Sequence, residues 1–372
     1  MKKPFVPQLL PHTDVQWEPL IPLMGQANRA LARYDGVLHG VPNPAVLLSP
    51  LITQEAVLSS RIEGTQATLG DVLKFEAGEQ PRHEAQRLDI QEITNYRKAL
   101  RAAEQELVSR PFNLNLLLKL HSILLDSVRG RDKSRGRFRA IQNYIGAPNT
   151  PLEQASFIPP EPSRLAPLMD NWEKYYHMDR PDPLVQLAVV HAQFEIIHPF
   201  LDGNGRLGRI LIPLYLYERK VLSKPMFYLS EYLEKNRDAY VEHLRCLGET
   251  DGAWNKWVMF FLTALIEQAK QNAKKAEDIM ALYARLKARV LELTHSQFAV
   301  PLLDVLFIRP VIRSSEIRKH RGMPSTPMVM NMIGKLKDDG ILTVVRAGSG
   351  RRAQVLALKD LINLCEGRKV FK

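Results

Sequence analysis

Residues 198–209 read HPFLDGNGRLGR and crowd one histidine, one aspartate, two arginines and an asparagine between two glycines into a short stretch. Glycine and asparagine tolerate positive φ angles, so the turn at residues 203–205 can point consecutive backbone N–H groups into one anion-binding concavity. This turn leads into the N-terminus of a predicted helix, the end that favours phosphate. Arg206 and Arg209 share a face of that helix, and their two guanidinium groups indicate more than one phosphate.

Two further residues of the stretch add chemistry to the anion site. Asp202 would repel a polyphosphate unless a cation lay between them, and Mg²⁺ is typically held by one or two carboxylates together with phosphate oxygens. His198 can take a proton from a hydroxyl near pH 7. Singly, each residue fits a structural role, as a core histidine, a common turn or a solvated arginine. Their combination in one junction predicts nucleotide transfer by attack on a bound phosphate.

Most of the chain has a helical period, and a helix over 182–198 must deliver His198 to this site. Asp182 is a suitable N-cap, Pro183 suits the first helical position, and Pro199 ends the helix. One apolar face is predicted from Leu184, Leu187, His191, Phe194 and His198. A second helix is predicted from about Arg206, and others at 90–108, 113–128, 164–178, 230–246 and 253–292.

Strand patterns are confined to two regions. Residues 137–158 alternate around the turn-rich IGAPNTP and predict a β-hairpin. Near the C-terminus, helices are predicted at 300–310, 314–322 and 325–340, followed by two strands around residues 348–350. Three helices and a hairpin are the order of a winged helix-turn-helix. Arg346, Arg351 and Arg352 crowd the turn of this wing, where a phosphate contact is expected.

Composition bounds the class of protein. The 372 residues carry a net charge of +11, which suits either a polyanionic partner or a solvated basic surface. The two cysteines, Cys246 and Cys365, match no metal spacing and argue for a reducing compartment without a disulfide framework. The first twenty residues lack the apolar run of a signal peptide, and no stretch is apolar enough for a membrane span. A cytoplasmic protein without a membrane partner is expected.

HPFLDGNGRLGR resembles the signature of the Fic family and matches it at every defined position. The resemblance implies a mainly α fold, a helical bundle with a β-hairpin flap, that transfers AMP from ATP to a protein hydroxyl and releases pyrophosphate. Gly205 stands where a kinase-like branch has lysine, which favours AMP transfer. Carried over position by position, the resemblance makes His198 the base and Asp202 the Mg²⁺ ligand. It gives the binding of phosphates to Gly203, Asn204, Gly205 and Arg206, and the γ-phosphate to Arg209. Phe200 would be a core anchor. Tyr240 matches the first of two adjacent tyrosines that lie near the adenine in many members, and the second position is valine here.

An upstream stretch, SSRIEG, matches the inhibitory motif of many Fic proteins at Ser59 and Glu63. Ser49 and Pro50 predict the start of a helix and Gly64 its C-cap, so Glu63 is expected in the last turn. A carboxylate there opposes the helix dipole by about 0.3–1 kcal/mol. The resemblance implies that Glu63 pairs with Arg209, blocks the γ-phosphate position and keeps the enzyme at low activity. In some relatives the same glutamate helps to remove AMP.

Four parts of the chain are predicted: an N-terminal helical region carrying the inhibitory motif (1–85), the Fic core (86–275), a linker helix (276–296) and a small winged helix-like domain (297–372). The expected partner is a target protein with a Ser, Thr or Tyr hydroxyl, or the chain itself. A DNA or protein partner of the winged helix and a homodimer are left open. Two other functions stay open as well: a nucleotide-sensing, DNA-binding regulator with low turnover, and a related activity such as AMP removal or transfer of UMP or phosphocholine.

Overall fold

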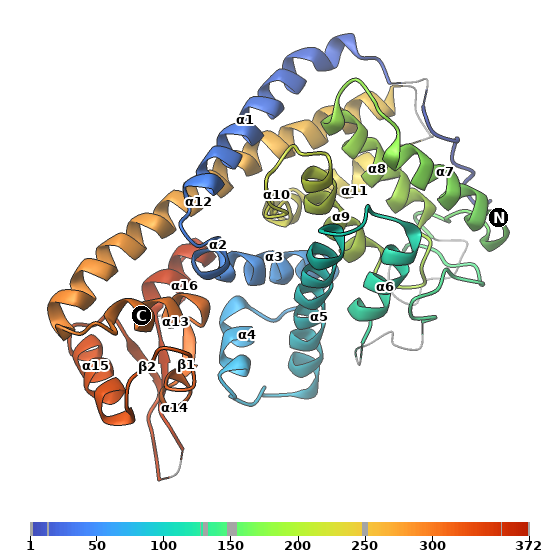
Figure 1. Cartoon of the computed structure of the whole chain (residues 1–372). Helices are drawn as coiled ribbons and strands as arrows, with labels where there is room; N and C mark the ends of the chain where they lie inside the picture. Colours follow the sequence, from blue (N-terminus) through green and yellow to red (C-terminus); the bar gives the residue numbers. More distant parts are fainter. Residues whose placement is uncertain are drawn as a thin grey trace. The chain divides into compact units, whose positions relative to one another are not determined.

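The computed structural model describes residues 3–12, 15–126, 128, 133–146, 155–247, 252–350 and 352–370. Most of them are helical, and the three strands lie in the C-terminal part (Figure 1), which confirms the mainly α fold class. The chain divides into two compact units. Unit 1 comprises Met1–Asp35, Leu58–Gly64 and Thr94–Lys270, and unit 2 comprises Gly36–Val57, Thr65–Ile93 and Gln271–Lys372. No helix within the described residues is long and apolar enough to cross a membrane.

Unit 1 carries most of the helices. They are η1 (Glu18–Leu20), α6 (Leu114–Leu124), η3 (Pro162–Arg164), α7 (Leu165–His177), α8 (Pro183–Ile197), α9 (Asn204–Glu218), α10 (Ser230–Lys235) and α11 (Arg237–Arg245). Four longer helices contribute residues to both units, namely α1 (Ile21–Gly40), α3 (Ser49–Ile62), α5 (Glu84–Leu107) and α12 (Ala253–Thr294).

Helix α8 is the centre of unit 1 and is buried on all sides. Every residue from 184 to 197 except Glu195 is buried. Trp172 of α7 and Trp257 of α12 donate their indole N–H groups to main-chain carbonyls of α8 at 2.9 and 2.8 Å. The predicted single apolar face is therefore wrong, because the polar side chains of α8 are buried as well and find partners inside the core.

Several predicted helix bounds differ from the structure, and three of them affect the site or its neighbourhood. The predicted helix at 230–246 is two helices, α10 and α11, because Asn236 leaves the helical conformation with φ −112° and ψ 33°. Helix α9 begins at Asn204, before the predicted start. Helix α3 ends at Ile62, so Glu63 lies in the turn after the helix rather than in its last turn, ahead of Gly64 with φ +102°.

The predicted hairpin at 137–158 is joined, in its described residues, by a single antiparallel bridge between Ile145 and Phe157. Ile145 N–H donates to the Phe157 carbonyl at 2.8 Å, and Phe157 N–H donates back at 3.1 Å. Most of the turn IGAPNTP, residues 147–151, lies outside the described residues. The N-terminal segment lies beside this hairpin, called the flap below, because Phe5 N–H donates to the Ile158 carbonyl at 2.9 Å.

Unit 2 contains a small antiparallel sheet with strand order β1-β3-β2, made of β1 (Val311–Arg313), β2 (Thr343–Arg346) and β3 (Val355–Ala357). Its helices are α2 (Pro44–Leu47), α4 (Leu69–Glu76), α13 (Ala299–Ile308), α14 (Ser314–Ile317), α15 (Thr326–Asp338) and α16 (Lys359–Glu366). Helix α13 packs on α2, α4 packs on β1, and α16 packs on α4. The helices predicted at 300–310 and 325–340 and both hairpin strands are present, whereas the helix predicted at 314–322 is reduced to the four residues of α14. Strand β1 and helix α16 were not predicted. Arg351 of the predicted wing lies outside the described residues.

Candidate functional site

His198 stands at the junction of α8 and α9 in a left-handed conformation, with φ 47° and ψ 59°. Such angles are strained for a residue other than glycine and persist only where the surroundings impose them. Here the His198 N–H donates to the Phe194 carbonyl at 3.0 Å, and Arg139 Nε donates to the His198 carbonyl at 3.0 Å. Pro199, which follows, disfavours a helical conformation for His198. The junction therefore holds the imidazole in a defined place.

The hydrogen bonding of His198 defines which ring nitrogen is a base. Nδ1 lies 3.2 Å from the main-chain carbonyl of Glu195. A carbonyl oxygen only accepts, so Nδ1 carries the proton and Nε2 presents a lone pair. Burial lowers the pKa of His198 to about 4, so the ring is neutral at pH 7. A neutral imidazole with a free Nε2 can accept a proton from a substrate hydroxyl.

The loop after His198 is fastened by Asn204, whose side chain is buried. Its Oδ1 accepts from the Phe200 N–H and its Nδ2 donates to the Phe200 carbonyl, each at 2.9 Å. Gly203 precedes α9 with φ 81°, which suits glycine. The Asn204 side chain is thus committed to Phe200. An anion at the positive end of α9 would therefore be bound by backbone N–H groups near residues 203–205 rather than by the Asn204 side chain.

Arg206 and Asp202 form an ion pair at the mouth of this helix end. Arg206 Nη2 donates to Asp202 Oδ1 at 3.1 Å, and the Arg206 side chain is buried. Asp202 is half-buried, with 36% of its side chain exposed. No group of three or more histidine, cysteine or acidic side chains among the described residues is arranged to hold a metal ion by itself. A lone half-exposed carboxylate fits Mg²⁺, which takes its other ligands from phosphates and water.

Arg209 is bound from three directions by the end of α3 and the turn after it. Its Nε donates to Ser59 Oγ at 2.9 Å, and its Nη2 donates to the Ser59 carbonyl at 2.9 Å and to Glu63 Oε1 at 2.6 Å. The Arg209 side chain is 1% exposed, whereas Glu63 keeps 38% of its side chain exposed. Two nitrogens of the guanidinium, Nε and Nη2, are therefore engaged, while the carboxylate remains partly exposed and lines the cavity.

Gly205 makes room for this ion pair. A Cβ at Gly205 would lie 2.1 Å from Glu63 Oε1 and 2.9 Å from Arg209 Nη1. Desolvation acts to raise the pKa of Glu63, but the nearby guanidinium of Arg209 outweighs it and the net shift is downward. Glu63 is therefore ionised at neutral pH. Burial acts to lower the pKa of Arg209, and the charge of Glu63 reverses this into a net rise.

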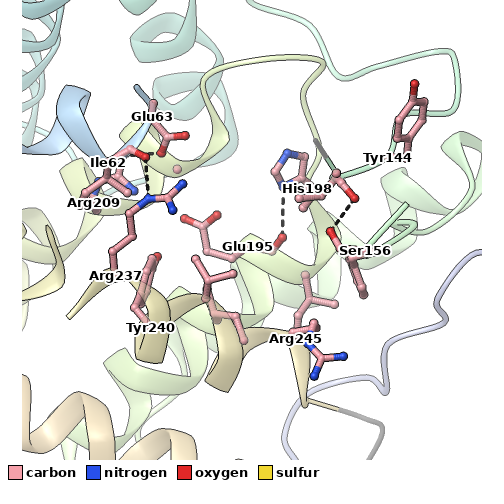
Figure 2. A pocket seen from close by; sticks show the side chains of 17 residues that line it. Ile62, Glu63, Tyr144, Ser156, Glu195, His198, Arg209, Arg237, Tyr240 and Arg245 are labelled. Atoms are coloured by element: carbon pink, nitrogen blue, oxygen red, sulfur yellow. Dashed lines mark hydrogen bonds and ion pairs between the residues drawn. The ribbon is translucent and has the colours of Figure 1, made fainter. Parts of the chain in front are cut away.

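These residues open into one cavity of about 430 Å³ in unit 1. Figure 2 shows Glu63 and Arg209 on one side of it, His198 on another and Glu195 between them. Further lining comes from residues 144–157 and from α11, including Tyr144, Ile145, Phe157, Arg237, Tyr240, Val241, Leu244 and Arg245. A cavity that mixes apolar and cationic side chains in this way suits an organic anion such as a nucleotide.

Sequence comparison decides the family. Residues 21–105 match the N-terminal domain of the Fic/DOC family, and residues 111–216 match the Fic/DOC family domain itself.

The chain belongs to the Fic/DOC family.

Curated relatives match part of this Fic chain. A probable protein adenylyltransferase of Aquifex aeolicus is 34% identical over 92 residues, which are 24% of this chain and 26% of the relative. Protein adenylyltransferase Fic of Drosophila grimshawi is 31% identical over 128 residues, 32% of this chain and 24% of the relative. The chain thus spans about a quarter of the length of these relatives.

Solved structures share the fold. A Fic family protein from Desulfovibrio desulfuricans superposes with a TM-score of 0.58 at 20% identity, covering 96% of this chain and 98% of that one. A Fic domain-containing signalling protein from Bacteroides thetaiotaomicron gives a TM-score of 0.54 at 18% identity, covering 68% of this chain and 97% of that one. The first likeness extends over nearly the whole Fic chain.

Tyr240 lies on the wall of the cavity, and its hydroxyl is engaged. Its oxygen lies 2.9 Å from His191 Nε2, and His191 Nδ1 lies 3.2 Å from the Gly208 carbonyl. Since that carbonyl accepts, Nδ1 carries the proton and Nε2 accepts from the tyrosine. Burial lowers the pKa of His191 to about 3, which keeps this neutral form. The hydroxyl of Tyr240 is therefore used inside the core, which leaves its ring as the part that lines the cavity.

Sequence reasoning missed Glu195, which lines the cavity of this Fic core. Its Oε1 is buried without a hydrogen-bond partner among the described residues. A Cβ at Gly208 would lie 2.3 Å from this oxygen, so glycine there admits the carboxyl. Burial raises the pKa of Glu195 to about 8, against a smaller lowering by Arg209. The sequence pattern gives no sign of Glu195, because a single acidic residue on a helix is normally expected to face solvent.

Two positioning residues were also missed. His121 of α6 stacks on Phe200 with ring centroids 3.8 Å apart, accepts from the Gly136 N–H at Nδ1 (2.9 Å) and faces the Asp202 carbonyl with Nε2 (3.0 Å). It therefore joins the base of the flap to the loop of the Fic signature. Arg139, at the start of the flap, donates a hydrogen bond to the His198 carbonyl. Both act over long sequence separations, so no local pattern marks them.

Proposed function

We propose that this chain is a protein adenylyltransferase that transfers AMP from ATP to a Ser, Thr or Tyr hydroxyl of a target protein or of itself. One observation carries the proposal: the neutral His198, with its free Nε2, opens into the same cavity as Arg209 and Gly205. The printed names of the relatives from Aquifex aeolicus and Drosophila grimshawi support it.

In this reaction His198 Nε2 accepts the proton of the acceptor hydroxyl. The hydroxyl oxygen forms a bond to the α-phosphorus of ATP, and the bond from that phosphorus to the oxygen bridging the β-phosphorus breaks. Pyrophosphate leaves with the electron pair. The backbone N–H groups at residues 203–205 and the helix N-terminus stabilise the charge that develops on the α-phosphate, and Arg206 binds phosphate oxygens.

Asp202 is the residue that would hold Mg²⁺, which when bound neutralises charge on the phosphates of ATP. Arg206 orients the Asp202 carboxylate through the 3.1 Å ion pair. The flap positions the target, because an extended target segment can pair with backbone near Ile145 as an added strand.

Glu63 acts as a brake in this proposal. Arg209 is expected to reach the γ-phosphate, yet its guanidinium is engaged by Glu63 and Ser59. An arginine that is already paired with a carboxylate is not available to grip a phosphate. The resting protein therefore has low activity until Glu63 leaves.

Removal of AMP from a target is the second candidate function, and the position of Glu63 favours it. Its ionised carboxylate lines the same cavity as His198 and remains partly exposed. A carboxylate there can orient a water molecule toward a phosphodiester. The two directions of reaction would then share His198 and differ in their use of Glu63.

The deciding experiment incubates cell lysate and Mg²⁺ with wild type, Glu63→Gly or the double variant Glu63→Gly/His198→Ala. Parallel samples receive α-³²P-ATP or γ-³²P-ATP. AMP transfer labels protein from the α-position only, and the label disappears in the double variant. Label from the γ-position would indicate kinase action, and no label with ATP still bound would favour a nucleotide-sensing regulator.

A further inference from the structure

Unit 2 contains two neighbouring cavities that share Ser315 of α14 in their linings. The first, of about 610 Å³, is lined by Arg313, Arg346 and Arg352 together with Glu79. The second, of about 850 Å³, lies between α14 and the start of α15 and is lined by Arg318, Lys319, Ser325 and Thr326. Five basic side chains thus line these two adjoining cavities, which we call the basic track: Arg313, Arg346, Arg352, Arg318 and Lys319, with the hydroxyls of Ser315, Ser325 and Thr326.

The first cavity is built to hold guanidinium groups close together. Arg313 Nη2 donates to the Gly78 carbonyl at 2.8 Å. A Cβ at Gly78 would lie 1.5 Å from that nitrogen, and the φ of +81° there also favours glycine. Arg313 Nε is buried and lacks a hydrogen-bond partner in the described part of the chain. A buried donor without a partner is costly, so an anion in this cavity would relieve it.

Few acidic side chains lie near the basic track to neutralise its positive charge. Glu79 pairs with Arg346 at 2.9 Å and is the one acidic residue in the two linings. Within the described residues, Arg318, Lys319 and Arg352 form no ion pair, and all three side chains are exposed. Glu316 of α14 is paired with Arg309 at 3.1 Å. The charge of the track therefore remains available to an anionic partner.

The shape of the track distinguishes between anions. A single phosphate would fill one of the two cavities, whereas a chain of phosphates would occupy both and pass Ser315. Serine and threonine hydroxyls beside arginines, next to the start of a helix, are typical contacts to a sugar-phosphate backbone. The exposed residues of α15 beyond Thr326 are Pro327, Met328, Met330, Asn331 and Asp338, and none of them is basic. Asn331 and Asp338 alone give few contacts for reading bases, so backbone contact dominates.

We propose that the basic track binds the sugar-phosphate backbone of duplex nucleic acid, with Arg346 and Arg352 on one stretch of phosphates and Arg318 and Lys319 on the next. Binding is driven by charge and depends weakly on base sequence. Glu79 competes with the backbone for Arg346, so it limits affinity. The inference is independent of AMP transfer, since none of these residues lines the cavity of unit 1.

The test measures fluorescence anisotropy of a fluorescein-labelled DNA duplex of about 20 base pairs, roughly two helical turns, with the full chain. Wild-type affinity should fall steeply with salt. Arg346→Gln/Arg352→Gln should weaken binding by about 10-fold or more at low salt and flatten the plot of log affinity against log salt by about one to two units. Glu79→Gln should strengthen binding several-fold.

The matched control is Arg29→Gln/Arg33→Gln, which removes the same charge from exposed positions of α1. It should bind like wild type. Arg318→Gln/Lys319→Gln, at exposed positions, tests the track if the first double variant melts early. Equal losses in control and track variants, or no saturable binding at about 50 mM salt, would overturn the proposal. So would displacement of the duplex by inorganic phosphate at matched ionic strength, which would indicate a single phosphate site.

Discussion

Arg209 on α9 is bonded to Glu63 across 146 positions of sequence, with Nη2 of the arginine 2.6 Å from Oε1 of the glutamate. The same guanidinium donates hydrogen bonds to the hydroxyl and to the carbonyl oxygen of Ser59. Three hydrogen bonds from Nε and Nη2 of this arginine are thus made inside the protein. A phosphate that binds through either nitrogen must first displace one of them.

Replacing Glu63 should release the brake. A charge-assisted hydrogen bond contributes about 1.5–3 kcal/mol, so Glu63→Gly should raise the rate of AMP transfer by about 10- to 100-fold. Label from α-³²P-ATP on target or on the chain itself measures it. Ser59→Ala is the matched control, because it removes one bond to Arg209 and keeps the ion pair. Ser59→Ala should raise the rate of AMP transfer by less than Glu63→Gly does. Equal rates in wild type and Glu63→Gly would show that Glu63 does not inhibit the enzyme.

His198 should be indispensable for transfer but not for ATP binding. In the Glu63→Gly background, His198→Ala should lower the rate by about 10²- to 10⁴-fold, the usual contribution of a general base. ATP affinity, measured by calorimetry, should change little. The neutral ring persists down to a pH of about 4, because burial lowers its pKa. Protonation of His198 should therefore not lower the rate of AMP transfer between pH 8 and pH 6. A fall in rate centred near pH 6.5 would show that the pKa of His198 is not lowered.

The local part of the site follows from sequence in part. Gly203 has the positive φ that the sequence predicts, whereas Asn204 and Gly205 already belong to α9, which was predicted to begin at about Arg206. The left-handed conformation of His198 was not predicted. The mainly α class follows from helical periodicity. Helix ends were less accurate, since Asn236 interrupts one predicted helix and α3 stops one residue before Glu63.

The long-range part of the site does not follow from local patterns. The pair of Glu63 with Arg209 was expected only through a motif resemblance, since nothing in the spacing of 146 residues indicates a contact. His121 and Arg139 act on the signature loop from α6 and from the flap, and each is ordinary in its own segment. Strand β1 has three residues, too few for an alternating pattern to be recognised.

Glu195 should make stability depend on pH. Burial raises its pKa to about 8 from an ordinary value of 4.5. Between these values the folded state keeps a proton that the unfolded state releases, so stability falls as pH rises from about 5 to about 8. Glu195→Gln mimics the protonated carboxyl and removes this loss. Its melting temperature should exceed that of wild type by a margin that widens over this range.

The control for this titration is Glu267→Gln, which changes a carboxylate that is exposed on α12. Its melting temperature should follow wild type at every pH. A constant difference between Glu195→Gln and wild type from pH 5.5 to pH 8 would mean that Glu195 titrates normally in the folded protein.

Asn204 should contribute to stability through Phe200. Asn204→Ala leaves the N–H and the carbonyl of Phe200 without their partners in a buried loop. Each buried unsatisfied group costs about 1–3 kcal/mol, so a drop of this order in the free energy of unfolding is expected from denaturant titration. ATP affinity should fall with it, because the loop carries the phosphate-binding N–H groups. A stable variant with unchanged affinity would contradict the assignment.

Tyr240 separates the role of a ring from that of a hydroxyl. Its hydroxyl donates to His191 Nε2 inside the core, so Tyr240→Phe should cost about 1 kcal/mol of stability and leave ATP affinity within about threefold. Tyr240→Ala also removes the ring, and loss of a stacking surface worth about 1–3 kcal/mol should weaken ATP binding by about 10-fold or more. Calorimetry in the Glu63→Gly background measures both, with Tyr232→Phe as the control. If phenylalanine weakens binding as much as alanine, the hydroxyl contacts the nucleotide and the bond to His191 must break on binding.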